Sequence, residues 1–162
     1  MSVRPTLPIF GICMGHQLMG LAAGADVYKM TYGNRGHNQP VLCLDANGQS
    51  GLCYVTSQNH GFALDDASFT GGWMPWFRNA NAQSNEGLRH RARPWRSVQF
   101  HPEAKGGPED TDWLFEAFVA DVRAYAASTV APSKAATMAA AQKTAAAAQA
   151  TMTPAAATAT NA

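Results

Sequence analysis

The fold of this chain is indicated most clearly by residues 8–23, which read PIFGICMGHQLMGLAA. Residues 8–12 form a short apolar run, which predicts a buried strand. Residues 14–23 place Leu18 and Leu21 on one face of a predicted helix. A strand that passes almost directly into a helix is typical of α/β domains.

Downstream of this unit, short apolar runs alternate with turn-forming residues. Further strands are expected over residues 27–30, 41–44, 53–57, 62–64, 73–79, 88–91 and 96–100. A polar loop is expected over residues 33–40, GNRGHNQP, and a turn at Asn47-Gly48. A helix is expected from about residue 110 to Tyr125. Together these elements predict an α/β fold with a partly parallel sheet.

The last 37 residues differ in composition from the rest of the 162-residue chain. Residues 126–162 contain 18 alanines, 7 threonines and only two charged side chains, Lys134 and Lys143. An alanine face buries little apolar area, and prolines interrupt the segment. We therefore expect one folded domain over residues 1–125, followed by a disordered Ala-rich tail or linker over residues 126–162.

Charge and cysteine content argue against several classes of protein. The 12 basic and 11 acidic side chains nearly balance, and no stretch is basic enough to predict a nucleic-acid partner. Three scattered cysteines do not suggest a disulfide scaffold, and no Cys or His spacing is typical of a metal site. No apolar run is long enough to predict a membrane-spanning helix. We therefore expect no nucleic acid, no metal and no membrane contact.

The segment GICMG, residues 11–15, is a candidate nucleophile elbow with cysteine as the nucleophile. In such a turn, glycines two positions before and after the nucleophile avoid Cβ clashes, and the nucleophile projects from the sheet. Cys13 would stand at a helix N-terminus, where partial positive charge favours a thiolate. A buried cysteine in a glycine-rich turn has the same short pattern, so the flanking strand and helix are needed to favour the elbow.

A candidate base lies in the segment QFHPE, residues 99–103, after the strand expected at 96–100. His101 and Glu103 are two positions apart, so their side chains project to the same side of an extended chain. Glu103 could accept a hydrogen bond from one ring nitrogen of His101 and leave the other nitrogen for the thiol. With Cys13, the two residues complete a Cys-His-Glu arrangement of the catalytic-triad type. A surface histidine beside a surface glutamate is the alternative interpretation.

A third polar segment, TSQNHG, spans residues 56–61 between two apolar stretches. Polar side chains beside a flexible glycine are typical of functional loops, and also of ordinary polar turns. His60 in this segment is a rival candidate for the base. Its neighbours in the sequence offer no carboxylate before Asp65, so we rank it below His101.

Taken in order, GICMGHQ, SQNHG and QFHPE resemble the class I (triad) glutamine amidotransferases. They look most like the glutaminase domain of carbamoyl-phosphate synthetase. The segment GNRGHNQP at residues 33–40 resembles the eukaryotic form, notably that of the multifunctional pyrimidine-pathway proteins, and SNEG and GGP at residues 84–87 and 106–108 fit it. The resemblance covers roughly residues 7–122. It implies a flavodoxin-like fold, with a mixed sheet flanked by helices.

The resemblance implies a role for each matching residue. Cys13 would attack the side-chain amide of L-glutamine, His101 would activate Cys13 and protonate the leaving ammonia, and Glu103 would orient His101. A γ-glutamyl thioester would form, and water would then release glutamate. The glutamine substrate would be bound by a second set of residues: Met14, Gln17, Asn59, Gly61 and Phe62.

The resemblance also implies a partner. Ammonia would pass to a synthetase large subunit or to a fused synthetase domain, which would bind ATP, Mg²⁺ and bicarbonate. No cofactor is expected in this chain, which has no GxxxxGK phosphate-binding motif. The pathway would be pyrimidine or arginine synthesis, in the cytoplasm, or in mitochondria for an arginine-specific enzyme.

Two other interpretations stay open. The chain could serve another class I pathway, such as guanylate or anthranilate synthesis, although residues 33–40 argue against it. It could also be a non-catalytic docking or regulatory fragment, although Cys13, His101 and Glu103 are all present. Members of the family have further sequence before the elbow strand, including a loop that contributes to the oxyanion hole. The chain thus resembles the C-terminal half of the domain, and we expect its 162 residues alone to have little glutaminase activity.

Overall fold

The computed structural model describes residues 6–129, apart from the side chain of Ser50. Backbone contacts separate residues 1–126 from residues 127–162, and the whole sheet belongs to the first of these units. The predicted tail began at residue 126, but residues 126–129 continue the last helix of the structure. The rest of the predicted tail, residues 130–162, lies outside the described residues.

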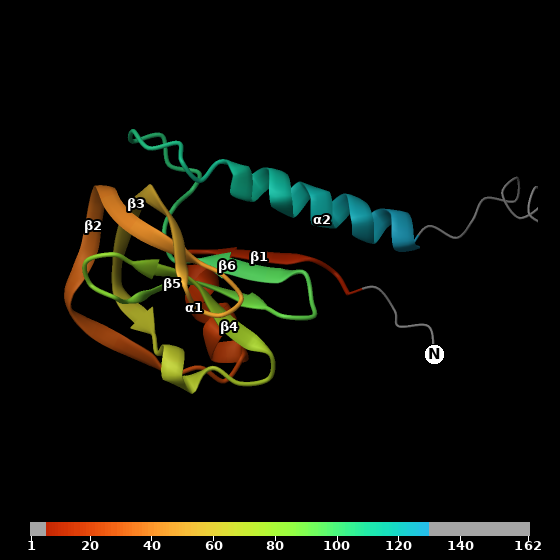
Figure 1. Ribbon diagram of the computed structural model, residues 1–162, viewed down its shortest axis with the longest axis horizontal. Helices are drawn as coiled ribbons and strands as arrows, with labels where there is room; N and C mark the ends of the chain where they lie inside the picture. The colour runs from red at the N-terminus through yellow and green to blue at the C-terminus, as the bar shows by residue number, and fades with distance from the viewer. Residues whose placement is uncertain (1–5, 130–162) are drawn as a thin grey trace, which may run out of the picture. The chain divides into compact units, whose positions relative to one another are not determined.

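Over residues 6–129, six strands form one sheet, which is mostly antiparallel (Figure 1). In spatial order its strands are β1-β6-β5-β4-β2-β3. Among the described strands, only β1 and β6 pair in parallel, so the predicted mixed sheet is confirmed. The strand bounds are β1 (Ile9–Ile12), β2 (Val27–Leu44), β3 (Ser50–Leu64), β4 (Trp73–Asn79), β5 (Asn85–His90) and β6 (Trp95–Val98).

Two helices cover opposite faces of the sheet at β1. Neighbouring residues of a strand point to opposite faces. Phe10 packs its ring against Phe115 and Phe118, whereas Gly11 lies against Met19. Phe115 and Phe118 belong to the C-terminal helix, and Met19 belongs to the helix that follows β1. Figure 1 shows these two helices on either side of the sheet. The helix bounds are α1 (Met14–Ala22) and α2 (Trp113–Thr129), with a 3₁₀ turn η1 (Asp66–Ser68) between β3 and β4.

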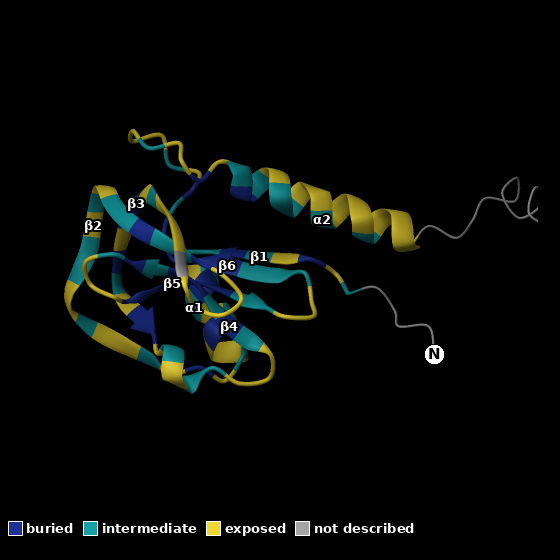
Figure 2. Cartoon of the chain, in the orientation of Figure 1, coloured by how far each residue is buried: buried dark blue, intermediate teal, exposed yellow. Residues whose placement is uncertain are grey.

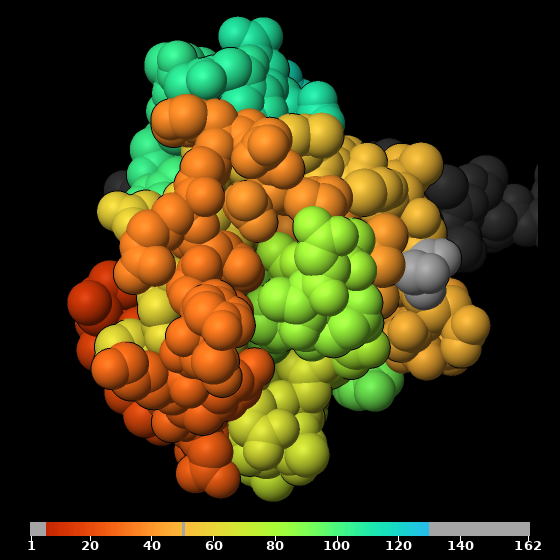
Figure 3. Space-filling model, turned by 90° about the vertical axis from the view of Figure 1, so that its left-hand side faces the viewer, coloured from red at the N-terminus to blue at the C-terminus, as the bar shows by residue number. Residues whose placement is uncertain are grey.

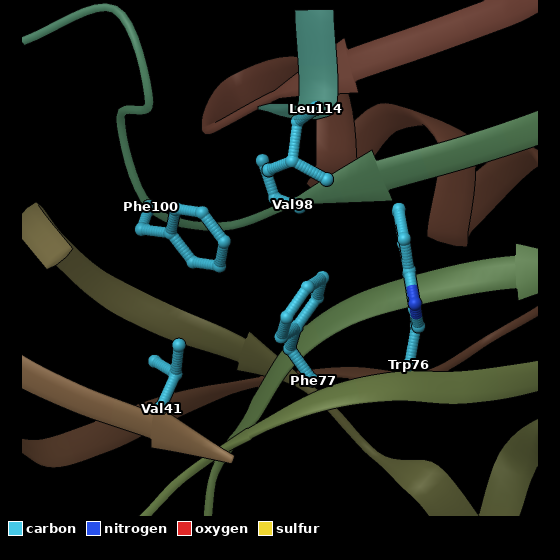
Figure 4. Close-up of a cluster of buried hydrophobic side chains, with 6 residues drawn as sticks. All are labelled: Val41, Trp76, Phe77, Val98, Phe100 and Leu114. Atoms are coloured by element: carbon cyan, nitrogen blue, oxygen red, sulfur yellow. The ribbon is translucent and has the colours of Figure 1, made fainter. Parts of the chain in front are cut away.

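The main hydrophobic core lies between the sheet and α2 (Figure 4). We call its buried members, together with Trp113, the aromatic cluster; these members are Val41, Trp76, Phe77, Val98, Phe100 and Leu114. A smaller cluster consists of Ala25, Leu64 and Leu88. Gly20 of α1 packs against Leu64 of this cluster. Figure 2 shows the burial concentrated in the central strands, while the outer side of α2 is exposed.

Two predicted loops turned out to be parts of long strands. Residues 33–40, expected as a polar loop, lie inside β2, and the polar segment 56–61 lies inside β3. The two segments pair with each other, with Asn34 opposite His60 and Gln39 opposite Thr56. Main-chain pairing between distant segments thus overrides the low strand propensity of their polar and glycine residues.

The apolar stripe of α1 does not face the sheet. Leu18 and Leu21, predicted on one face, are 59% and 55% exposed. The buried residues of this helix are His16 and Gly20. A Cβ atom on Gly20 would overlap the side chain of Leu64, so the helix approaches the sheet through its small residue.

Candidate active site

The predicted elbow at Cys13 is present in the structure. Cys13 joins β1 to α1 with φ at 51°, a value that side chains other than glycine rarely adopt. Its N–H donates to the Val98 carbonyl oxygen at 2.9 Å. A Cβ on Gly11 would lie 2.7 Å from the Gly15 oxygen, so glycine is required before the turn. The sequence also predicted that position 15 must be glycine to avoid a clash. That prediction is wrong, because a Cβ on Gly15 would meet open space.

The environment of the thiol differs from the prediction of a favoured thiolate. Burial raises the pKa of Cys13 above its ordinary value of 9.0, and the nearby charge of Glu103 adds to this. Hydrogen bonds from the Met14 backbone N–H and the Gln99 side chain lower the pKa of Cys13, but the net pKa stays raised. The resting Cys13 therefore keeps its proton at neutral pH and needs a base to become a nucleophile.

His101 and Glu103 form the hydrogen bond expected from their spacing. The Nδ1 atom of His101 lies 2.8 Å from Oε1 of Glu103, and a ring N–H there donates to the carboxylate. The backbone N–H of His101 donates to the Ser57 carbonyl oxygen at 2.9 Å, which ties this segment to β3. The arrangement leaves Nε2 of His101 for a second partner.

The elbow and the His101–Glu103 pair lie at the same edge of the sheet. Parallel neighbours end at one edge, and Ile12 at the end of β1 pairs with Val98 at the end of β6. Cys13 follows the first strand and His101 follows the second. The influence of Glu103 on the pKa of Cys13 agrees with this proximity.

Gln99 is a residue of the site that sequence reasoning missed. Its Nε2 donates to Sγ of Cys13 at 3.7 Å, and its Oε1 accepts a hydrogen bond from Nε2 of Gln17 at 2.9 Å. Gln99 is fully buried. The signal in the sequence was a glutamine two positions before His101 in the segment QFHPE, at the end of a predicted strand.

The five residues expected to bind glutamine come from α1 and β3. Met14 and Gln17 stand on the first turns of α1, after the elbow. Asn59, Gly61 and Phe62 stand together on β3, where Asn59 pairs with Arg35 of β2. Met14 and Phe62 are 63% and 47% exposed, so both side chains are accessible to a ligand. Their role in binding glutamine stays a prediction.

His60 has a carboxylate partner that its sequence neighbourhood did not reveal. Its Nε2 lies 3.7 Å from Oε1 of Glu86, and both side chains are almost fully buried. Its Nδ1 lies 2.8 Å from the Phe62 carbonyl oxygen. Burial lowers the pKa of His60 and raises that of Glu86 to about 8. Both ring nitrogens of His60 thus have partners within the protein, which leaves neither free to act on a substrate.

His16 completes a group of buried polar residues beside α1. Its Nδ1 is hydrogen-bonded to Oγ of Ser97 at 2.9 Å. Within residues 6–129, Nε2 makes no hydrogen bond of good geometry, although the nearby Asn85 side chain favours the protonated ring. Complete burial lowers the pKa of His16 to about 3, so its ring is neutral at physiological pH. We call the buried residues His16, Gln58, His60, Ser84, Glu86 and Ser97 the polar cluster.

Metal-binding clusters and membrane-spanning helices are both absent from the described part of the chain. Over residues 6–129, no three or more His, Cys, Asp or Glu side chains come together in a way that could hold a metal ion. None of the helices over the same residues has the length and hydropathy needed to cross a membrane.

Comparison with known proteins places this site in a family. Residues 2–120 match the family model "Glutamine amidotransferase class-I". The arginine-specific small chain of carbamoyl phosphate synthase from Neosartorya fischeri is 53% identical over 125 residues, which are 77% of this chain and 27% of that protein. Multifunctional protein pyr1-3 from Dictyostelium discoideum is 57% identical over 116 residues, or 70% of this chain and 5% of that protein.

A solved structure agrees with these matches. A protein described as a GMP synthase subunit from Thermoplasma acidophilum superposes with a TM-score of 0.62 at 26% identity, covering 73% of this chain and 58% of that one. The chain spans about a quarter of the length of the curated small chains that it matches. The family model nevertheless covers most of its residues, and the chain belongs to the class I glutamine amidotransferase family.

Proposed function

We propose that this chain is the glutamine-hydrolysing part of a carbamoyl-phosphate synthetase that releases ammonia from L-glutamine. The observation that carries the proposal is the joint position of a nucleophile elbow and a His101–Glu103 pair at one edge of the sheet. Identity of 53–57% to a carbamoyl phosphate synthase small chain and to multifunctional protein pyr1-3 supports the reaction class.

The chemistry follows from the protonation of the three residues. The thiol of Cys13 is protonated at rest, so His101 must take its proton as the sulfur attacks the side-chain amide carbon of glutamine. Glu103 accepts from Nδ1 of His101, which holds Nε2 ready for that proton and stabilises the imidazolium. The imidazolium then protonates the amide nitrogen, the C–N bond breaks, ammonia departs, and a γ-glutamyl thioester remains on Cys13. Water hydrolyses this thioester and releases glutamate.

The substrate contacts and partners are part of the same proposal. Met14 and Gln17 on α1, with Asn59, Gly61 and Phe62 on β3, would hold the glutamine beside the elbow. Ammonia would pass to a synthetase large subunit or fused synthetase domain that binds ATP, Mg²⁺ and bicarbonate. The product would serve arginine or pyrimidine synthesis, in the cytoplasm, or in mitochondria for an arginine-specific enzyme.

Guanylate synthesis is the second candidate, because the GMP synthase subunit superposes on this chain. Its 26% identity is about half of the 53% to the carbamoyl phosphate synthase small chain. The acceptor of the ammonia separates the two functions. A bicarbonate- and ATP-dependent acceptor supports the favoured proposal, and a purine-nucleotide acceptor supports the alternative.

The proposal is tested by Cys13→Ala in the full-length protein assembled with its synthetase. Glutamine-dependent carbamoyl phosphate synthesis should fall by at least about a thousandfold, since the nucleophile is gone. Synthesis from added ammonium should be unchanged, because Cys13 serves only the first half-reaction. Cys53→Ala, at an exposed cysteine, is the matched control and should leave both activities intact. Loss of both activities in Cys13→Ala would contradict the proposal.

A further inference from the structure

Glu86 is a buried carboxyl group on which two other strands, β2 and β3, converge. Its exposed fraction is 0%, and its Oε1 accepts from Nδ2 of Asn34 at 3.1 Å and from Oγ of Ser84 at 3.0 Å. The ring of His60 approaches the same oxygen at 3.7 Å. Asn34 is on β2, His60 on β3 and Glu86 on β5, and Figure 3 shows the turn between β4 and β5 packed against the long strand β2. Such a residue can hold several strands in register.

Both ring nitrogens of His60 face hydrogen-bond acceptors. The Nδ1 atom is 2.8 Å from the carbonyl oxygen of Phe62, and the Nε2 atom is 3.0 Å from Oε1 of Gln58. A neutral imidazole has one N–H and one lone pair, so it can satisfy only one of these acceptors. An imidazolium satisfies both. The hydrogen-bond geometry therefore favours a proton on each nitrogen.

The orientation of the Gln58 amide is set by the next hydrogen bond along. Nε2 of Gln58 donates to Oγ1 of Thr56 at 3.0 Å, and that hydroxyl donates to the Gln39 carbonyl oxygen at 2.8 Å. With the amide reversed, the Thr56 hydroxyl would have to donate to Gln58 and to Gln39 at once. A hydroxyl has a single proton. Oε1 of Gln58 therefore points at His60 and requires a donor there.

His60 and Glu86 behave as one titrating pair. Burial lowers the pKa of His60 and raises that of Glu86 to about 8, so the pair retains one proton at pH 7 and burial alone would place it on Glu86. The hydrogen bonds act against burial and decide which residue carries the proton. If the proton sat on Glu86, one acceptor facing His60 would be left without a donor. If it sits on His60, both acceptors facing the ring are satisfied and Oε1 of Glu86 receives donors from Asn34 and Ser84, while Oε2 of Glu86 has no hydrogen-bond partner within residues 6–129. The side chain of Asn79 also favours the ionised carboxylate.

We propose that Glu86 is a positioning residue whose buried carboxylate keeps His60 as an imidazolium and thereby fixes the strand segment 59–62. Other charged groups near His60 oppose its second proton. Arg35 of β2 and His101 after β6 both disfavour it, and neutral His16 of α1 adds no counter-charge. Glu86 is thus the countercharge on which the protonated state depends.

The segment held in this way carries proposed contacts to glutamine, so the functional half of the inference rests on the proposed function. The Nδ1–H of His60 donates to the carbonyl of Phe62, which spans Gly61 between the two residues. Loss of that donor would free the main chain at Asn59, Gly61 and Phe62 without touching Cys13. The expected defect is in glutamine binding rather than in the chemical step.

The protonation of His60 can be measured without any assay of activity. In the 162-residue chain labelled with ¹⁵N-histidine, both ring nitrogens of His60 should show the ¹⁵N shifts of an imidazolium at pH 7. In Glu86→Gln the ring should be neutral, with one protonated nitrogen. The exposed Glu116→Gln on α2 is the matched control and should leave the imidazolium unchanged. A neutral ring in the wild-type chain would overturn the inference, whether or not the variant folds.

The kinetic arm uses the full-length protein assembled with its synthetase. In Glu86→Gln, the KM for glutamine should rise about tenfold while kcat changes by less than about twofold. Ammonia-dependent synthesis by Glu86→Gln should equal that by the control variant Glu116→Gln. An unchanged KM in a folded Glu86→Gln variant would refute the positioning role. If the wild-type protein has no glutamine-dependent activity, the proposed function fails, and the ¹⁵N experiment still decides the state of His60.

Discussion

The two buried clusters of this domain differ in what they are made of and in what they do. The aromatic cluster between the sheet and α2 consists of apolar side chains, with Phe77 in ring contact with Trp76 and Phe100. The polar cluster beside α1 contains two histidines and one carboxyl group. Burial lowers the pKa of His16 and of His60, and it raises the pKa of Glu86. The first cluster provides stability that does not depend on pH. The second makes stability and strand geometry depend on where protons sit.

This difference explains why the site lies where it does. The elbow residue Cys13 starts α1, and the proposed glutamine contacts on β3 are held by His60 of the polar cluster. Polar groups buried with specific partners fix one arrangement, since any other leaves a donor or an acceptor unsatisfied. An apolar cluster tolerates small shifts of its members. Polar packing is therefore suited to the side of the sheet that must position a substrate.

The largest expected effect comes from removing the centre of the aromatic cluster. Phe77→Ala deletes a ring with no exposed surface and should lower the free energy of unfolding by about 3–5 kcal/mol. The loss should be the same at pH 6 and pH 8. Urea unfolding at both values measures it, with Val122→Ala at an exposed position of α2 as the control. A loss of stability that varied strongly with pH would contradict the claim that the aromatic cluster stabilises the fold independently of pH.

The next effect belongs to His16, which is buried without a charge. Its pKa is about 3 in the folded protein against 6.5 in the unfolded chain, so only the unfolded chain binds the proton in between. Stability should therefore fall as pH drops below 6.5, by roughly 3 kcal/mol at pH 4.5. Urea unfolding of wild type and His16→Gln at pH 7 and 4.5 measures the difference. An imidazole NMR signal of His16 that titrated near pH 6.5 would contradict the account.

The His60–Glu86 pair should give stability the opposite pH dependence to that of His16. The folded pair keeps one proton to about pH 8, while the unfolded chain loses its histidine proton near 6.5. Stability should fall as pH rises from 6.5 to 8, by roughly 2 kcal/mol. Glu86→Gln should lack this slope. Equal slopes for wild type and variant in urea unfolding would show that the pair does not hold the proton.

The smallest effect concerns the ion pair between Arg96 of β6 and Asp121 of α2. Both side chains are partly exposed, at 20% and 25%, so solvent screens their attraction. Asp121→Asn should lower the free energy of unfolding by about 1 kcal/mol, and less in high salt. Thermal unfolding at two salt concentrations checks it. A loss as large as that of Phe77→Ala would mean that charge, rather than apolar packing, holds α2 to the sheet.

Local features of the site could be predicted from the sequence because neighbouring residues determine them. The elbow at Cys13 depends on the adjoining strand, helix and Gly11, and the His101–Glu103 hydrogen bond depends on a spacing of two in an extended chain. The electrostatic part of that prediction was wrong. Burial of the thiol, a tertiary property, outweighs the helix N-terminus in setting the pKa of Cys13.

Long-range features could not be predicted, because they depend on which strands become neighbours. The polar segment 33–40 is a strand only because it pairs with residues 55–60. His60 looked unpartnered for the same reason, since its carboxylate, Glu86, comes from β5. The solvent-facing stripe of Leu18 and Leu21 on α1 shows that helical periodicity alone does not tell which face packs on a sheet.

The central claim is that Cys13 is a nucleophile served by His101, and competitive labelling of the three cysteines tests it most directly. The chain is treated briefly with an electrophilic glutamine analogue, and labelled peptides are quantified. Cys13 should react at least about tenfold faster than the exposed Cys53 or the half-buried Cys43, and His101→Asn should remove that advantage. Faster labelling of Cys53, or an advantage of Cys13 that survives His101→Asn, would contradict the account.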